Sequence, residues 1–172
     1  LDVDPGDLVN DDDTVNLDLE GIAMASTASG SGFWLVSEGS GTAGDPDRPV
    51  TSPNLLLRNL GNGKFANVSA TAGDGLQPVK ASRGTAFDDL DNDGDVDVLS
   101  ASMSLRGRSV NWYVNDGTGN FVDYGGVEAE QYDAGDVHAA DFDGDGDLDI
   151  LSASYAMHSP HVGWYENSGR SD

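Results

Sequence analysis

Two acidic stretches decide how this chain folds: FDDLDNDGDVDVLSAS at residues 87–102 and AADFDGDGDLDILSAS at residues 139–154. They lie 52 residues apart, and every aspartate of one nine-residue loop, 89–97, matches an aspartate of the other, 141–149. At the same offset Trp112-Tyr113 aligns with Trp164-Tyr165. A match that keeps one period over this length indicates an internal structural repeat.

Each repeat predicts several short strands joined by tight turns. After the acidic loop come apolar strands at 96–102 and 110–115, a turn rich in Gly and Asn, and a further strand at 121–124. Residues 59–65 resemble the turn at 115–121 and point to an earlier, weaker copy. Short strands with glycine-rich turns are typical of propeller blades. We therefore expect an all-β fold of propeller-type blades, with about three units of short antiparallel strands in an open or partial propeller.

The chain divides into three segments of one continuous β-repeat domain. Residues 1–50 form an irregular first unit, with strands expected at Gly21–Ala25 and Gly32–Ser37. Residues 51–109 carry the first acidic loop, and residues 110–172 carry the second. Helix is disfavoured because the chain has 23 glycines and no sustained apolar spacing of three and four residues.

The acidic loops predict two calcium sites. Five carboxylates within nine residues repel one another unless a cation lies among them, and calcium accepts six to eight oxygen ligands in flexible geometry. Gly94 and Gly146 stand at the sixth position, where the chain must turn sharply. The predicted metal ligands are Asp89, Asp91, Asp93, Asp95 and Asp97 in the first loop, and Asp141, Asp143, Asp145, Asp147 and Asp149 in the second.

Two other interpretations of these loops compete with a calcium site. An EF-hand needs a glutamate at position twelve and flanking helices, but Ser100 and Ser152 stand there and strand-forming residues follow each loop. The other alternative is a solvated acidic turn without metal.

Apolar residues stand between the aspartates of each loop and are expected to point into the core: Leu90, Val96, Phe142 and Leu148.

The amino-acid composition excludes some classes of binding partner. Eight basic residues against 31 acidic ones give a formal charge of -23, which repels nucleic acid and anionic lipid surfaces. No apolar run reaches the roughly 20 residues of a membrane helix, so no membrane insertion is expected. The chain has no cysteine and therefore no disulfide. We expect an extracellular or cell-surface protein that bound calcium stabilises in place of disulfides. Adaptation to salty water is an alternative source of the surplus charge.

With these residues in view, positions 52–170 resemble the FG-GAP/VCBS repeats of integrin-like propellers and of many microbial surface proteins. The resemblance implies a calcium-stabilised β-propeller that serves adhesion or structural assembly, with other copies of the protein or a cell-surface partner. A closed propeller of this family has about seven blades, and the last unit stops at Asp172 before its outer strand. We therefore expect either a fragment of a longer chain or open ends that another copy covers head to tail, giving a filament.

Two functions of other classes compete with this one. Asp18–Ala23 and Gly32–Glu38 are similar to a segment of phytase-like esterase propellers, which suggests a part of a secreted hydrolase. Because no G-x-S-x-G elbow is present and His138, His158 and His161 show no ligand spacing, we expect no enzyme. A carbohydrate-binding module could use Trp34, Trp112 and Trp164. The last two recur at the repeat period inside strands, which favours a core role.

Overall fold

The computed structural model describes residues 2–3, 18–27, 30–38, 55–61, 64–76, 81–103, 110–127, 134–154 and 161–169. Within these residues the chain is all-β, with no α-helix and one short 3-10 turn at Ser69–Thr71. The strands are β1 Asp2–Val3, β2 Asp18–Thr27, β3 Gly30–Glu38, β4 Leu57–Gly61, β5 Lys64–Asn67, β6 Ala81–Asp88, β7 Asp97–Met103, β8 Val110–Asn115, β9 Phe121–Gly126, β10 Ala134–Ala140, β11 Asp149–Ser154 and β12 His161–Tyr165.

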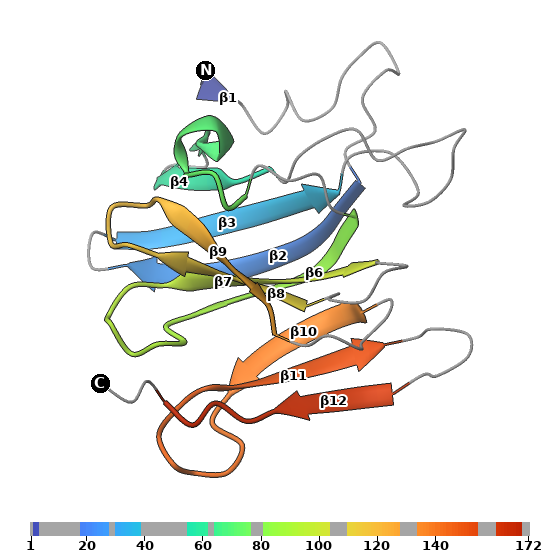
Figure 1. Ribbon diagram of the computed structural model, residues 1–172. Helices are drawn as coiled ribbons and strands as arrows, with labels where there is room; N and C mark the ends of the chain where they lie inside the picture. Colours follow the sequence, from blue (N-terminus) through green and yellow to red (C-terminus); the bar gives the residue numbers. More distant parts are fainter. Residues whose placement is uncertain are drawn as a thin grey trace.

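These strands form four small antiparallel sheets, in the orders β1-β5-β4, β2-β3, β6-β7-β8-β9 and β10-β11-β12. Figure 1 shows them following one another in space in nearly the same order as in the chain. Among the described strands no sheet closes on itself. The predicted fold class of blade-like antiparallel units is therefore confirmed, and so are the strands expected near 21–25 and 32–37.

The four-stranded sheet shows why the repeat folds as a blade. Its central strand β7 pairs with β6 on one side and β8 on the other, with Leu99 opposite Ala86 and Trp112. Successive side chains of a strand point to opposite faces. Leu99 accordingly enters one core cluster with Val137 and Ile150, and Val98 enters a second with Leu56 and Tyr113. The sheet is thus buried on both faces at β7, whereas Val122 and Tyr124 on β9 are exposed.

Two expectations about burial are wrong. Trp164 is 52% exposed rather than a core residue, and Phe142 is 47% exposed. In the four-stranded sheet, Tyr124 on β9 lies against Trp112. In the β10–β12 sheet the described residues include no fourth strand, so Trp164 has no such cover.

The four-stranded sheet includes β7, which ends before residue 109, and β8, which begins after it. The division of the chain into 1–50, 51–109 and 110–172 is a prediction about sequence repeats, and it stays a prediction.

Candidate metal centre

Each acidic loop connects the first two strands of a sheet. Residues 89–96 join β6 to β7, and residues 141–148 join β10 to β11. Gly94 has a φ of 94° and Gly146 a φ of 100°, so both adopt the left-handed conformation that the sharp turn requires. Asn92 has a φ of 58° at the position where the second loop has Gly144. Asn is among the few other residues that tolerate this conformation.

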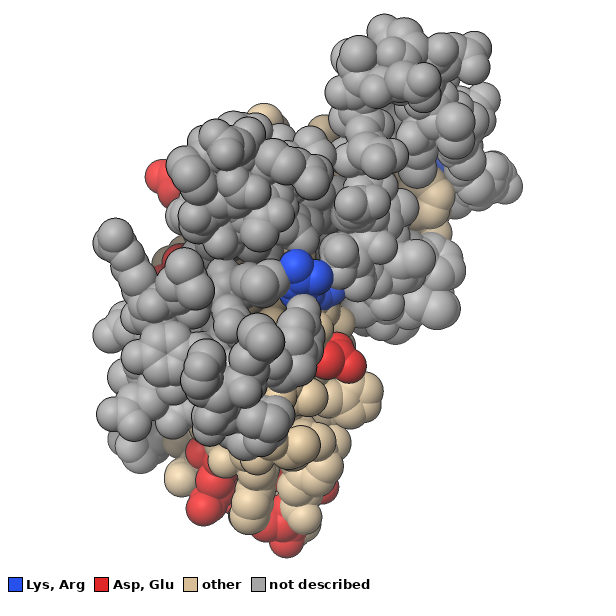
Figure 2. All heavy atoms as spheres, turned by 90° about the vertical axis from the view of Figure 1, so that its right-hand side faces the viewer, with Lys and Arg blue, Asp and Glu red and all other residues tan. Residues whose placement is uncertain are grey.

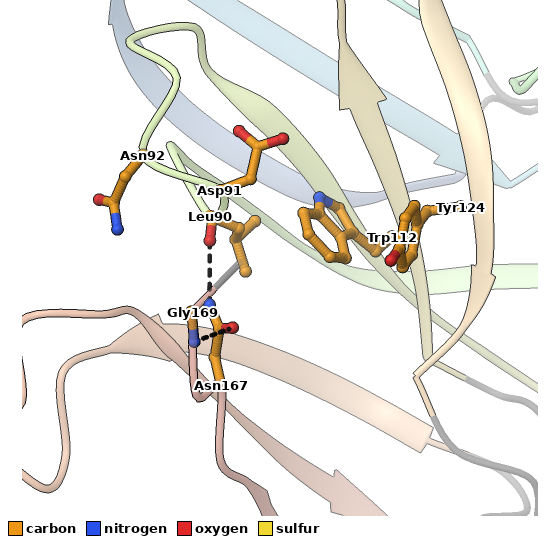
Figure 3. Close-up of a pocket in the computed structure, with 7 residues that line it drawn as sticks. All are labelled: Leu90, Asp91, Asn92, Trp112, Tyr124, Asn167 and Gly169. Atoms are coloured by element: carbon orange, nitrogen blue, oxygen red, sulfur yellow. Dashed lines mark hydrogen bonds between the residues drawn. The ribbon is translucent and has the colours of Figure 1, made fainter. Parts of the chain in front are cut away.

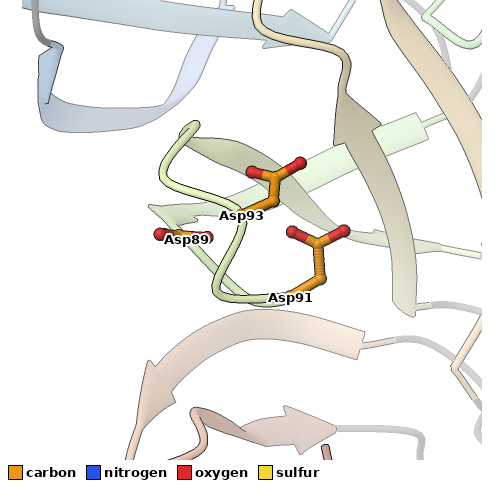
Figure 4. A group of neighbouring side chains, drawn as sticks. All are labelled: Asp89, Asp91 and Asp93. Atoms are coloured by element: carbon orange, nitrogen blue, oxygen red, sulfur yellow. The ribbon is translucent and has the colours of Figure 1, made fainter. Parts of the chain in front are cut away.

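The first three alternate aspartates of each loop come together. Asp89, Asp91 and Asp93 each offer a carboxylate oxygen, and these oxygens lie within 4.8 Å of one another (Figure 4). The second loop repeats this grouping with Asp141, Asp143 and Asp145, also within 4.8 Å. The first group is partly buried at Asp89 and Asp91, whereas all three members of the second are exposed.

Backbone donors hold the two groups in the same way. The N–H of Gly94 donates to Asp89 Oδ2 at 2.9 Å, and the N–H of Gly146 donates to Asp141 Oδ2 at 3.2 Å. In both loops the backbone N–H of the seventh residue donates to the carboxylate of the fifth. The Asp95 N–H lies 2.9 Å from Asp93 Oδ1, and the Asp147 N–H lies 2.9 Å from Asp145 Oδ1. Both loops therefore orient their carboxylates by the same local hydrogen bonds.

Asp95 and Asp147 are placed differently from these triads. A Cβ added to Gly117 would lie 2.5 Å from Asp95 Oδ2, and one added to Gly169 would lie 2.5 Å from Asp147 Oδ2. Each carboxylate therefore rests on the backbone of a left-handed glycine, with φ of 78° at Gly117 and 72° at Gly169. The fourth aspartate of each loop, at the seventh position, thus contacts the turn that follows the third strand of its sheet.

Asp97 and Asp149 are fully buried, at 0% exposure. The indole Nε1 of Trp112 donates to Asp97 Oδ2 at 2.9 Å, and the backbone N–H of Asn115 donates to Oδ1 at 2.8 Å. Asp149 receives the same two bonds from Trp164 at 3.1 Å and the N–H of Asn167 at 2.8 Å. Sequence reasoning missed this role, although Trp and Asn recur 15 and 18 residues after each aspartate.

Burial and crowding shift the pKa values of these groups. Burial, together with the charges of Asp91 and Asp93, raises the pKa of Asp97 to about 6, although the bonds from Asn115 and Trp112 lower it. The pKa of Asp149 is lowered, because its bonds from Asn167, Trp164 and Phe142 outweigh desolvation. At Asp143 the bond from the Asp145 N–H lowers the pKa, but desolvation and neighbouring carboxylates outweigh that bond and leave the pKa raised.

Calcium fits the chemistry of the first triad. Asp89 Oδ1 is a buried oxygen with no hydrogen-bond partner, although a buried carboxylate oxygen ordinarily has one. A cation held by Asp89, Asp91 and Asp93 would satisfy this oxygen and relieve the repulsion among the three charges. All the side-chain ligand atoms of the triad are carboxylate oxygens, and such ligands favour binding of calcium over binding of zinc.

Two hydrogen bonds donated by side-chain amides connect the two units at the loops. Asn92 Nδ2 in the first loop donates to Asp147 Oδ1 in the second at 2.7 Å. Asn167 Nδ2 donates to the Leu148 carbonyl at 3.1 Å within its own unit and to the Leu90 carbonyl at 3.0 Å across the units. The spacing inside either repeat contains no signal for the cross-unit contacts.

Together the fold and the loops define a class, an all-β repeat protein whose units carry an acidic loop between their first two strands. Residues 89–152 match the family model described as FG-GAP-like repeat, which confirms the resemblance seen in the sequence. The chain is also 30% identical over 111 residues, 62% of its length, to cartilage acidic protein 1 of Mus musculus. It spans 17% of that protein's length. Within the described residues, no helix has the length and apolar character needed to span a membrane.

Proposed function

We propose that this protein is a non-enzymatic, extracellular β-repeat protein that binds one calcium ion in each acidic loop. The observation that carries the proposal is the paired geometry: two triads, 52 residues apart, each with carboxylate oxygens within 4.8 Å. The FG-GAP-like repeat over residues 89–152 and the similarity to cartilage acidic protein 1 support a repeat protein outside the cell. Calcium is plentiful there, and extracellular calcium modules bind it weakly.

In the proposed sites, Asp89, Asp91 and Asp93 hold the first ion, and Asp141, Asp143 and Asp145 hold the second. Asp97 is electrostatically part of the first site, because the charges of Asp91 and Asp93 raise its pKa. We include Asp95, Asp147 and Asp149 as the carboxylates that complete or brace the loops. The ion supplies charge neutralisation, and the chain supplies the turn that places the carboxylates.

A calorimetric titration with calcium tests this assignment. We expect two sites in the wild type, with dissociation constants on the order of 10⁻⁴ to 10⁻³ M. The variant Asp89→Asn/Asp91→Asn/Asp93→Asn should keep one site, and Asp141→Asn/Asp143→Asn/Asp145→Asn should keep the other. The matched control Asp74→Asn/Asp123→Asn/Asp136→Asn removes the same charge from exposed positions outside the loops and should keep both. Absence of binding heat in the wild type would overturn the proposal.

An adhesive or self-assembling role has one structural observation in its favour. Val162 is 67% exposed and Trp164 is 52% exposed, and both lie on β12 at the edge of its sheet. An exposed apolar edge strand is a template for pairing with another chain. We propose that this edge contacts another copy of the protein or a cell-surface partner. Light scattering at increasing protein concentration with calcium present tests self-assembly, and a strict monomer throughout would contradict it.

A further inference from the structure

A groove separates the four-stranded sheet from the β10–β12 sheet, beside the first acidic loop. Its volume is about 250 Å³, and its floor includes the buried Leu90 and Ile150. Trp112, Tyr124, Tyr165 and Glu166 also line it. Figure 3 shows the adjoining part of the groove, with Trp112 and Tyr124 on one side and Asn167 on the other. The groove is large enough for a small organic group.

The aromatic walls are held in place and remain accessible. The indole of Trp112 is fixed by its hydrogen bond to the buried Asp97 at 2.9 Å. The ring of Tyr124 lies 4.6 Å from that of Trp112, centroid to centroid, with an angle of 47° between the planes. Tyr124 is 61% exposed, so a large part of it is free to contact a ligand.

The charge around the groove has one sign. Glu166 lines it, Asp91 lines the adjoining part, and none of the described residues that line either part is Lys, Arg or His. Figure 2 shows acidic side chains of described residues gathered at the lower end of the molecule, where Figure 1 places β10–β12. With a formal charge of -23, the chain attracts cations and repels anions.

We propose that this groove binds an alkylammonium group, carried by a lysine side chain of a partner protein. The faces of Trp and Tyr attract a cation placed within about 6 Å of the ring centroid. Glu166 supplies the opposite charge, and the apolar floor accommodates the methylene stem of the lysine. A neutral sugar could stack on the same rings but would leave the carboxylate without a charged partner.

Binding of an ammonium group in this groove does not require calcium. Asp91 belongs to the proposed first calcium site, whereas Glu166 lies after β12 and outside both loops. An ammonium group that contacts Glu166 and the rings therefore binds with the loops empty or filled. Calcium should weaken the binding without abolishing it, because it neutralises Asp91.

Choline and 3,3-dimethyl-1-butanol test the charge requirement, because they share a shape and differ in the positive nitrogen. Binding is followed by the NMR signal of the Trp112 indole N–H, assigned with Trp34→Phe and Trp164→Phe, in calcium and in chelator. We expect saturable binding of choline in both conditions, and binding of the neutral compound weaker by roughly 3- to 30-fold. A short glycine-rich peptide with one lysine should shift the same signal.

Three variants locate the site. Tyr124→Leu removes a π face and Glu166→Gln removes a charge, and each should weaken choline binding several-fold. Asp123→Asn, which removes one charge from an exposed residue that does not line the groove, should leave the affinity unchanged. Equal affinity for the two compounds, or equal effects of Glu166→Gln and Asp123→Asn, would overturn the proposal. Binding of methyl glucoside but not choline would indicate a sugar site instead, and binding of choline but not the lysine peptide would overturn the protein partner.

Discussion

At the residue scale, aspartates that alternate evenly along nine residues perform three different tasks. The first three aspartates of a loop, such as Asp89, Asp91 and Asp93, bring their carboxylate oxygens within 4.8 Å of one another. The fourth, Asp95, rests on the backbone of Gly117, and the fifth, Asp97, accepts the indole N–H of Trp112. The second loop repeats all three arrangements. Identical side chains thus differ in role because each meets a different neighbour.

Replacing Gly117 with Ala should destabilise the protein more than replacing Gly119 with Ala. Both glycines have positive φ, 78° and 86°, so each variant costs about 1 kcal/mol of backbone strain. Only at Gly117 would the new Cβ lie 2.5 Å from Asp95 Oδ2, since nothing lies within 4 Å of the Cβ position at Gly119. Urea unfolding measures both. In an Asp95→Ala background the two substitutions should cost the same, and a persisting difference would contradict the proposed clash.

Asp97→Asn should lower the free energy of unfolding in chelator by about 1 to 3 kcal/mol. The carboxylate accepts one hydrogen bond on each oxygen, from Trp112 and Asn115. An amide has only one acceptor oxygen, so one buried donor would lose its partner. Denaturant titration followed by tryptophan fluorescence gives the value. Asp123→Asn, at an exposed position, should change it little, and an unchanged midpoint for Asp97→Asn would contradict the buried role.

At the element scale, side chains within the β8–β9 hairpin hold its turn. Asp116 accepts bonds from Thr118 Oγ1 at 2.6 Å, the Thr118 N–H at 3.0 Å and Asn120 Nδ2 at 2.9 Å. Thr118 and Asn120 lower the pKa of Asp116 to about 2. The hairpin therefore favours the ionised form of this carboxyl group.

The contribution of Asp116 to stability should depend on pH. Its pKa in the folded protein, about 2, lies below the ordinary value of 3.8, so folding favours the charged group. The contribution is fully present above about pH 4 and is lost as the pH falls through about 2. The difference in urea midpoint between wild type and Asp116→Asn, measured from pH 5 to pH 2, should shrink over this range. A constant difference would show that the charge of Asp116 is not the cause.

The stability that comes from the hydrogen bond between the two acidic loops should be measurable apart from the effect of backbone strain at Asn92. Asn92→Gly keeps the left-handed turn but removes the 2.7 Å bond to Asp147, and we expect a loss of about 0.5 to 1 kcal/mol. Asn92→Ala also strains the backbone and should cost about 1 kcal/mol more. Urea unfolding in chelator distinguishes the two. Equal stability of Asn92→Gly and wild type would mean that this bond does not stabilise the packing of the units.

At the scale of the whole molecule, stacked sheets carry a formal charge of -23. One core cluster joins Leu99 and Ile150 of neighbouring sheets, and the other joins Leu56, just before β4, to Tyr113 of β8. Apolar burial therefore opposes a general repulsion that either salt or a specific cation can reduce. The two effects differ in the concentration of ion that they need.

Calcium should raise the melting temperature more than sodium chloride at equal ionic strength. At about 10 mM free calcium and a dissociation constant of about 10⁻⁴ to 10⁻³ M, each filled site adds about 1.4 to 2.7 kcal/mol. Calorimetry of the wild type and of the two triple loop variants measures the effect, and each variant should lose about half of it. The same rise in sodium chloride would show screening instead of binding.

The local features of this protein can be predicted from its sequence. Contacts between residues close in the chain produce the strand pattern, the left-handed turns at Gly94 and Gly146 and the grouping of alternate aspartates. The spacing of the acidic loops indicated a cation site, which remains a prediction. Backbone conformation and side-chain periodicity act over a few residues, so a single repeat already contains this information.

Packing between distant segments sets which aspartates are buried and how the two units meet. Asn92 reaches Asp147 across 55 residues, and Asn167 reaches the Leu90 carbonyl across 77. Trp112 and Trp164 occupy equivalent repeat positions, yet Tyr124 covers the first while the second is 52% exposed. These equivalent residues differ because β9 places Tyr124 beside Trp112, whereas the described part of the β10–β12 sheet has no fourth strand.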